Sequence, residues 1–362
     1  MMPPMLRSAF AVALVAVSAV PPALSQETPP RPALAPSPEP PFLVRTWPKD
    51  RGTPVAVVGA HTITLGELVE HLDARHYPGF GKALDSMPGM RAYLQSDLIA
   101  PWVRQFADLD ALRQTFVEPP IDEDKLKAAQ SEALRQGFQG FLDTYVADLR
   151  QRGLPTDLSQ RRVNSLLADW QLRHGLGCEL QGLLDYLEPG DYTTPQLREF
   201  FLANARAFGG QVNIEHILVQ HRDGGTGILL ADAGIARANT RLADIKARLR
   251  PDGSNFADIA RQFSDDTRTG REGGKLDGVH RFDDRLPAGL CRAAWSLRDG
   301  EVSDVVETQY GWHIVRRVDF SQQVFVLFTD AAIPDIKQVM RRAMQEERLF
   351  HAREQAKVSL RL

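Results

Sequence analysis

The sequence contains little of what cross-linked or strongly charged proteins are made from. Two cysteines in 362 residues exclude a disulfide-stapled scaffold and a cysteine-rich metal cluster. The formal net charge is only −3, which argues against a protein built around nucleic acid or an anionic membrane. The remaining composition, with 43% hydrophobic and 25% charged residues, is ordinary for a globular chain that buries a core. The length is typical of two or three domains.

Long apolar runs are also scarce. The run at residues 9–20 is shorter than the roughly 20 residues that a membrane-spanning helix needs. Arg7 precedes it and Ala23-Leu24-Ser25 follows it, a pattern typical of a signal peptide over residues 1–25. An uncleaved membrane anchor is the alternative. We expect cleavage near Ser25, an exported protein that is periplasmic or secreted, and no stable membrane insertion.

The next part of the chain divides into a linker and a helical region. Residues 26–52 are rich in proline and predict an extended Pro-rich linker. Val55–Val58 predicts a strand, and Thr64 with Glu67 forms a capping box that opens a helix. The pattern from about residue 90 to 207 is helical, so 53–208 is expected to be a helical domain. Breaks are predicted at Pro119-Pro120, Gly153-Leu-Pro155, Gly175-Leu-Gly177 and Pro189-Gly190.

At Gly209-Gly210 the pattern changes to that of a compact α+β domain over 209–320. Residues 212–219 predict a strand, residues 270–278 a flexible glycine-rich loop, and Val305-Val306 and 312–315 two further short strands. Three helices are expected between the first and last strands, in the order β-α-α-α-β-β. The C-terminal part, 321–362, predicts a strand-like run at 324–328, a helix at 335–353 and a final strand at 358–362.

Five stretches of residues 212–319 together resemble the parvulin family of peptidyl-prolyl isomerases. They are Glu215-His-Ile-Leu-Val219, the helix and its exit at 255–266, Gly273-Gly-Lys-Leu276, the run from Arg285 to Ser303, and Glu307-Thr-Gln-Tyr-Gly-Trp-His-Ile314. Residues 55–67 and the C-terminal helix resemble single-parvulin folding factors of the SurA, PpiD and PrsA type. The resemblance implies an α+β fold in which the parvulin domain, a small mixed or antiparallel sheet wrapped by helices, is inserted in a mainly α-helical chaperone-like domain. The C-terminal strand and helix of 321–362 would return to that helical domain.

The resemblance also implies a set of site residues. Catalytic positions carried over from the family are His216, Asp266, Thr308 and His313. Substrate-binding positions carried over are Leu276, Leu286, Leu290 and Tyr310. Each has an alternative interpretation: the histidines could be a structural hydrogen-bond clamp, Asp266 could cap a helix, and the leucines could be ordinary core.

Two departures from the family pattern affect the expected activity. Leu290 stands where the family usually has an aromatic residue, and Asp277 replaces a glycine of the loop. Phe282 could supply the missing aromatic face. Arg222 is the only arginine or lysine in the loop 221–234, so no phosphate-binding cluster and no phospho-specificity are expected.

The resemblance leads to a function with a rival. We expect a peptidyl-prolyl cis-trans isomerase and folding factor for unfolded, proline-containing or newly exported polypeptides. The rival is a weak or inactive parvulin-fold chaperone that binds extended clients, for which aromatics such as Trp102 and Phe106 could line a groove or simply form core. No cofactor, metal or nucleic acid is expected, because the histidines show no zinc-binding spacing. Cys178 and Cys291 could pair, but burial as free thiols is favoured. The clients and the oligomeric state are not predicted.

Overall fold

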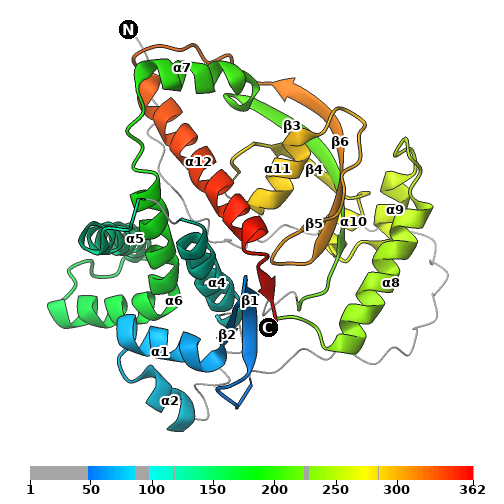
Figure 1. Cartoon of the computed structure of the whole chain (residues 1–362). Coiled ribbons are helices and arrows are strands. Elements are labelled where there is room, and N and C mark those ends of the chain that lie inside the picture. Colours follow the sequence, from blue (N-terminus) through cyan, green and yellow to red (C-terminus); the bar gives the residue numbers. More distant parts are fainter. Residues whose placement is uncertain (1–47, 87–97, 117–118, 224–227, 284, 362) are drawn as a thin grey trace.

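The computed structural model describes residues 48–86, 98–116, 119–223, 228–283 and 285–361. The signal peptide and most of the Pro-rich linker therefore lie outside the described residues. Figure 1 shows two antiparallel sheets with helices around them, which confirms the α+β class. None of the described helices is long and apolar enough to cross a membrane.

The helical unit, defined here as residues 54–203 together with 333–360, is closed by a small sheet of strand order β2-β1-β7. The strands are β1 (Pro54–Val58), β2 (His61–Thr64) and β7 (Ser359–Leu360), and β7 pairs antiparallel with β1. The predicted capping box is present: the Thr64 hydroxyl accepts from the Glu67 N–H, and the Glu67 carboxylate accepts from the Thr64 N–H. It starts the first helix of the unit directly after β2.

Helices form most of this unit. They are α1 (Leu65–Arg75), α2 (Phe80–Ser86), α4 (Ile99–Thr115), α5 (Glu123–Gln151), α6 (Gln160–Leu187), α7 (Thr194–Ala203) and α12 (Ile333–Gln355), with a 3-10 turn, η1, at Ala205–Ala207. Trp102 is completely buried and Phe106 packs against the same core, so these aromatics are core residues. The apolar faces of α1, α4 and α6 meet in that core.

The predicted break at Gly175-Leu-Gly177 is wrong, because α6 runs through it without interruption. The glycines serve close packing instead. A Cβ atom added at Gly175 would lie 2.6 Å from Nδ1 of His76, and one at Gly182 would lie 2.4 Å from the Cα atom of Gln130 on α5. Both substitutions would meet atoms already in place, so the glycines allow α6 to approach α1 and α5.

The second sheet belongs to the segment Gly210–Gln322 and has the strand order β4-β3-β6-β5. Its elements are β3 (Gly210–Val219), α8 (Asp232–Arg248), α9 (Phe256–Phe263), α10 (Thr267–Gly270), β4 (Lys275–Val279), α11 (Ala288–Ser296), β5 (Val306–Glu307) and β6 (Trp312–Gln322). All its pairings are antiparallel. We call this segment the β3–β6 unit.

The loop predicted at 270–278 is correct only for residues 271–274, because 275–279 form β4, which pairs with β3 through Ile214 and Leu276. The pairing is long-range and depends on a bend that local sequence does not reveal. At this bend Gly274 has φ +82, and its carbonyl accepts the His216 N–H at 2.8 Å. The glycine-rich run therefore positions an edge strand rather than a free loop.

Helices cover both faces of this sheet, as Figure 1 shows. On one face Val212 and Ile214 of β3 pack in a cluster with Leu290 of α11. On the other face Ile217 and Val219 pack in a cluster that includes Phe256 of α9. The alternation of the two clusters along β3 follows the period of two of a strand. The central strands are thereby buried on both sides.

The long helix α12 belongs to the helical unit and also contacts the β3–β6 unit. In Figure 1 it runs from α7 to β7, past the β3–β6 unit. Its Arg353 makes a bidentate ion pair with the buried Asp108 of α4, with distances of 2.7 and 2.6 Å. Its Glu346 pairs with Arg281 of the β3–β6 unit at 3.1 Å.

The strand predicted at 324–328 is wrong. This run forms neither helix nor strand; Val326 and Phe328 pack beside α7, whereas Phe325 is 84% exposed. The run has the apolar alternation of a strand but no neighbouring strand to pair with. Cys178 and Cys291 are free, as favoured, and burial raises the pKa of each thiol to about 11.

Candidate active site

Two histidines lie next to each other in the middle of the larger sheet. His216 is on β3 and His313 on β6, and the register places His313 opposite Leu218, two residues along from His216. The rings are therefore diagonal neighbours on one face of the sheet. They stack at a centroid distance of 5.6 Å with 19° between their planes, and both residues are 3% exposed.

A row of hydrogen bonds extends from this pair in both directions. The two Nδ1 atoms are 3.4 Å apart. On one side, Nε2 of His216 lies 2.8 Å from Oγ1 of Thr269 and 3.2 Å from Oδ2 of Asp266. On the other side, Nε2 of His313 lies 2.9 Å from Oγ1 of Thr308. Five side chains from separate parts of the β3–β6 unit thus form one continuous polar row inside an apolar sheet.

The charges in this row are set by burial and by hydrogen bonding. Burial, with the neighbouring His216 adding to it, lowers the pKa of His313 to about 3, so this imidazole is neutral at pH 7. The hydrogen bond from His216 holds the pKa of Asp266 well below its usual range, so this carboxylate is charged. The row therefore carries its negative charge at one end.

One assignment of the ring protons satisfies all four ring nitrogens. Because a carboxylate can only accept, Nε2 of His216 carries a proton and donates toward Asp266. Nδ1 of His216 then accepts from Nδ1–H of His313, and Nε2 of His313 accepts from the Thr308 hydroxyl. Thr308 Oγ1 in turn accepts the N–H of Tyr310 at 3.1 Å. Every donor in the row points toward Asp266.

Asp266 combines the two roles that the sequence left open. Its Oδ1 accepts the N–H groups of Arg268 and Thr269, at 3.1 and 3.2 Å, and so caps α10. Its Oδ2 faces His216. Thr269 was not predicted from the sequence. The available signal was its place three residues after a capping aspartate, which brings it next to that carboxylate.

The apolar positions carried over from the family separate into two groups. Leu276 and Leu286 are half-buried at the edge of the cluster that contains Leu290. Leu290 itself is 1% exposed and lies in the core under the sheet, so it offers almost no surface to a ligand. Tyr310 is 44% exposed in the turn between β5 and β6. The structure thus brings the polar residues together and leaves the leucines at different depths.

The structure also places Phe282, Asp277 and Arg222, the other residues considered in relation to activity and phosphate binding. Phe282 lies beneath two guanidinium groups, those of Arg281 and of Arg342 on α12, at 4.6 and 5.9 Å from its ring centroid. Asp277 is exposed on β4. Arg222 is buried, with its pKa lowered to about 10 by burial, so it does not present a cation to solvent as a phosphate site would require.

Within the described part of the chain, His216, His313 and Asp266 do not converge as three possible metal ligands. Among the described residues, three possible ligand side chains converge instead in the helical unit, at His71, His76 and Glu179.

Comparison with known proteins matches the β3–β6 unit to one family. Residues 216–319 match the family model Rotamase, the PPIC-type PPIASE domain. The foldase protein PrsA of Clostridium botulinum (strain Langeland) is 28% identical over 136 residues, 38% of this chain and 35% of the relative. The chaperone SurA of Sodalis glossinidius is 32% identical over 125 residues, 34% of this chain and 26% of the relative. The chain thus spans about a third or less of the length of these curated relatives.

Solved structures were also matched. Foldase protein PrsA from Streptococcus pneumoniae covers 84% of this chain and 93% of its own, at 14% identity and a TM-score of 0.31. The PPIase domain of TbPar42 covers 30% of this chain at 30% identity and a TM-score of 0.24. TM-scores this low do not define a shared overall arrangement.

Residues 216–319 are a PPIC-type domain of the parvulin class, and the relatives that share it are named foldase and chaperone.

Proposed function

We propose that this protein is a parvulin-type peptidyl-prolyl cis-trans isomerase and a folding factor for unfolded or newly exported envelope polypeptides. The observation that carries the proposal is the row of hydrogen bonds from Thr308 through the paired histidines to Asp266, inside the segment that matches the PPIC-type domain. Buried polar groups cost stability unless all of them are hydrogen-bonded. A row of polar side chains inside a buried sheet therefore favours a functional role.

The chemistry requires neither a nucleophile nor a metal. The X–Pro amide resists rotation by about 18–20 kcal/mol because of C–N resonance, and rotation is catalysed by binding the twisted amide better than the planar one. In our proposal Leu276, Leu286 and Tyr310 contact the proline residue. The neutral imidazole of His313, the ring of His216 and the Thr308 hydroxyl set a fixed polar environment at the amide. The depth of Leu290 makes it a support for this surface rather than a part of it.

The first test is an isomerisation assay on X–Pro peptides with several residues before proline. The wild type is compared with His216→Ala/His313→Ala, and with the control His351→Ala, whose side chain is exposed on α12. We expect acceleration by the wild type and by the control, and its loss in a double variant that remains folded by circular dichroism. No acceleration by the wild type over the spontaneous rate would refute the catalytic proposal.

A second test addresses the direction of the row. In Asp266→Asn, an amide replaces a group that can only accept, so the proton on His216 is no longer fixed at Nε2. We expect kcat/KM to fall about tenfold, equivalent to about 1.4 kcal/mol. The matched control is Asp258→Asn on the exposed face of α9, where no change is expected. Equal activity of the two folded variants would show that Asp266 only caps α10.

One observation favours client binding as a second function. Val324, Phe325 and Leu327 are 59, 84 and 73% exposed on the segment between β6 and α12. Adjacent exposed apolar side chains of this kind are typical of surfaces that bind other polypeptides. A chaperone function would not depend on the histidines. Suppression of aggregation by the folded His216→Ala/His313→Ala variant would therefore separate the two functions.

We also propose the domain division and the export route. Residues 1–25 would be a cleaved signal peptide, 26–52 a linker, 53–208 the helical domain, 209–320 the isomerase domain and 321–362 the returning segment. The apolar run at 9–20 and the site at Ala23-Leu24-Ser25 support export. N-terminal sequencing of the exported protein should begin at or near Gln26; an intact N-terminus would indicate an anchor instead.

A further inference from the structure

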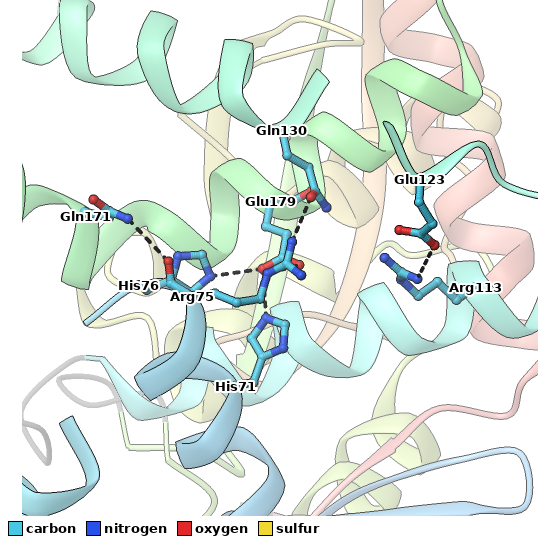
Figure 2. A network of polar contacts seen from close by, with 8 residues as sticks. All are labelled: His71, Arg75, His76, Arg113, Glu123, Gln130, Gln171 and Glu179. Carbon is cyan, nitrogen blue, oxygen red and sulfur yellow. Dashed lines mark hydrogen bonds and ion pairs between the residues drawn. The ribbon is translucent and has the colours of Figure 1, made fainter. Parts of the chain in front are cut away.

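A second polar cluster lies in the helical unit, away from the rotamase site. Figure 2 shows His71 and His76 directed at the carboxylate of Glu179. Nε2 of His71 is 2.8 Å and Nε2 of His76 is 3.0 Å from the same oxygen, Oε2. Glu179 is on α6, His71 is on α1, and His76 is the C-cap of α1. Two helices thus contribute nitrogen and oxygen donors to one point.

We propose that His71, His76 and Glu179 form a zinc-binding site. Two imidazole nitrogens and one carboxylate oxygen are a donor set that zinc uses in proteins, with a fourth position left open for water or another ligand. Bond lengths of about 2.0–2.1 Å around a tetrahedral ion place neighbouring donor atoms ~3.3 Å apart. The observed nitrogen-to-oxygen distances are 2.8 and 3.0 Å, and the three donor atoms all lie within 4.8 Å of one another, so small side-chain movements bring them to this spacing.

The surrounding residues hold the carboxylate in the orientation that the site requires. Nε of Arg75 lies 3.2 Å from Oε1 of Glu179, the oxygen that faces away from the histidines. Arg75 also donates to Oε1 of Gln130 at 2.9 Å, so its own position is fixed. Residues that hydrogen-bond a ligating group and orient it in this way are a regular feature of metal sites. Oε2 is left as the oxygen available to an ion.

The charge and donor types select among metals. The cluster has a single carboxylate, which is paired with Arg75, and its other two donors are nitrogens. Ca²⁺ and Mg²⁺ prefer sites made of oxygen ligands, so the cluster does not suit them. Imidazole donors suit Zn²⁺ and its neighbours among the transition metals.

Packing makes the site nearly closed but accessible. The side chains of Glu179 and His76 are 5 and 7% exposed, whereas that of His71 is 20% exposed and provides a path from solvent. Phe106 packs on the His71 ring at a centroid distance of 4.8 Å. Gly175 leaves room for the His76 ring, as described above. A bound ion would fasten α1 to α6 across the core of the helical unit.

The alternative is a hydrogen-bond clamp in which both histidines simply donate to Glu179. The two interpretations differ in whether the full-length chain takes up metal. Zinc-binding sequence motifs have closely spaced ligands. Here His71 and His76 lie 5 residues apart, and Glu179 lies 103 residues after His76. The absence of a motif therefore does not argue against the site.

The experiment uses untagged full-length protein after treatment with a chelator. Zinc uptake is measured by equilibrium dialysis, and Co²⁺ is added separately as a coloured substitute that reports coordination geometry. We expect one Zn²⁺ per chain, visible absorption bands typical of tetrahedral Co²⁺, and a melting temperature that rises by a few degrees with zinc. In His71→Gln, which replaces the most exposed ligand, zinc affinity should fall about 100-fold or more.

The matched control is His61→Gln. His61 also lies between two carboxylates, Glu67 at 3.0 Å and Asp110 at 2.7 Å, but these face different ring nitrogens and do not converge on one point. Its zinc uptake should equal that of the wild type. Glu179→Gln should lose uptake as well; if that variant does not fold, His71→Gln decides. No saturable uptake by the folded wild type, or equal uptake by His71→Gln, would overturn the proposal and leave the hydrogen-bond clamp.

Discussion

The two units of this protein each place a pair of histidines beside a carboxylate, but they arrange them differently. In the β3–β6 unit the rings stack across two strands, and the carboxylate of Asp266 faces only the outer nitrogen of His216. In the helical unit both histidines meet one oxygen of Glu179. The first arrangement passes hydrogen bonds along a row. The second gathers donors around a point.

The difference shows that residue types do not define a site. A strand presents alternate side chains to one face, so histidines on paired strands lie flat against each other. In the helical unit, His71 lies within α1 and His76 at its C-cap, and both side chains face Glu179 on α6. Backbone geometry therefore decides whether histidines and a carboxylate form a relay or a ligand set.

The largest effect is expected where the row depends on the backbone. A Cβ atom added at Gly274, where φ is +82, would lie 2.2 Å from the carbonyl oxygen of His216. Gly274→Ala should lower the free energy of unfolding by about 3 kcal/mol through strain and overpacking. The control Gly300→Ala has φ +85 but nothing within 4 Å, so about 1 kcal/mol is expected. Equal losses in urea denaturation would contradict the role of close packing at Gly274.

Leu290 tests whether the β3–β6 unit has a pocket or a core at this position. Because Leu290 is almost completely buried, Leu290→Phe should destabilise the protein by about 2 kcal/mol and should not raise isomerase activity. Leu202→Phe, on the exposed surface of α7, is the control and should change stability by less than about 0.5 kcal/mol. Faster isomerisation by a stable Leu290→Phe variant would instead make Leu290 part of the pocket.

Acid should affect the two clusters in different pH windows. The pKa of His313 is about 3 in the folded protein and ordinarily 6.5, so between these values the unfolded chain binds a proton that the folded chain does not. Stability should therefore fall on acidification from pH 6.5 toward 3, by up to about 1.4 kcal/mol per pH unit. The lowered pKa of Glu179, about 2 against 4.5, contributes only below about pH 4.5.

Urea denaturation at pH 7, 6 and 5 measures the first window. His313→Gln removes the titrating group, so its stability should depend less steeply on pH than that of the wild type. The same slope in both proteins would show that His313 takes up a proton in the folded state and that the row tolerates the charge.

The smallest effect on stability is expected at the exposed segment between the units. Phe325→Ser should change the free energy of unfolding by less than about 0.5 kcal/mol, because the side chain is exposed. It should weaken suppression of aggregation while leaving X–Pro isomerisation unchanged. Unchanged suppression in this variant and in Leu327→Ser would place client binding elsewhere.

Local signals in the sequence predicted local structure well. The capping box at Thr64 and Glu67 starts α1, the apolar stripe from Phe256 to Phe263 is α9, and the long C-terminal helix was placed within two residues of its observed limits. These elements are determined by neighbours within a few positions. The resemblance to a known family supplied the four polar positions 216, 266, 308 and 313, which the structure brings into one row.

Features that depend on distant partners were missed. Strand β4 forms because residues 275–279 pair with the edge of β3. The run 324–328 does not form a strand, because no strand of the described residues pairs with it. Glycines inside α6 indicated a break, although their purpose is contact with α1 and α5. The cluster at Glu179 was missed for the same reason, because His71 and His76 lie 108 and 103 residues from Glu179 in the sequence.

The pairing of β7 with β1 has a consequence for how the molecule is made. The β3–β6 unit holds all four of its strands in one continuous stretch, so it can close as soon as residues 210–322 are available. The sheet of the helical unit needs residues 359–360 beside residues 56–57. A chain synthesised from its N-terminus can therefore pair β1 with β7 only after residue 360 has emerged. Until then the sheet of the helical unit lacks one of its three strands.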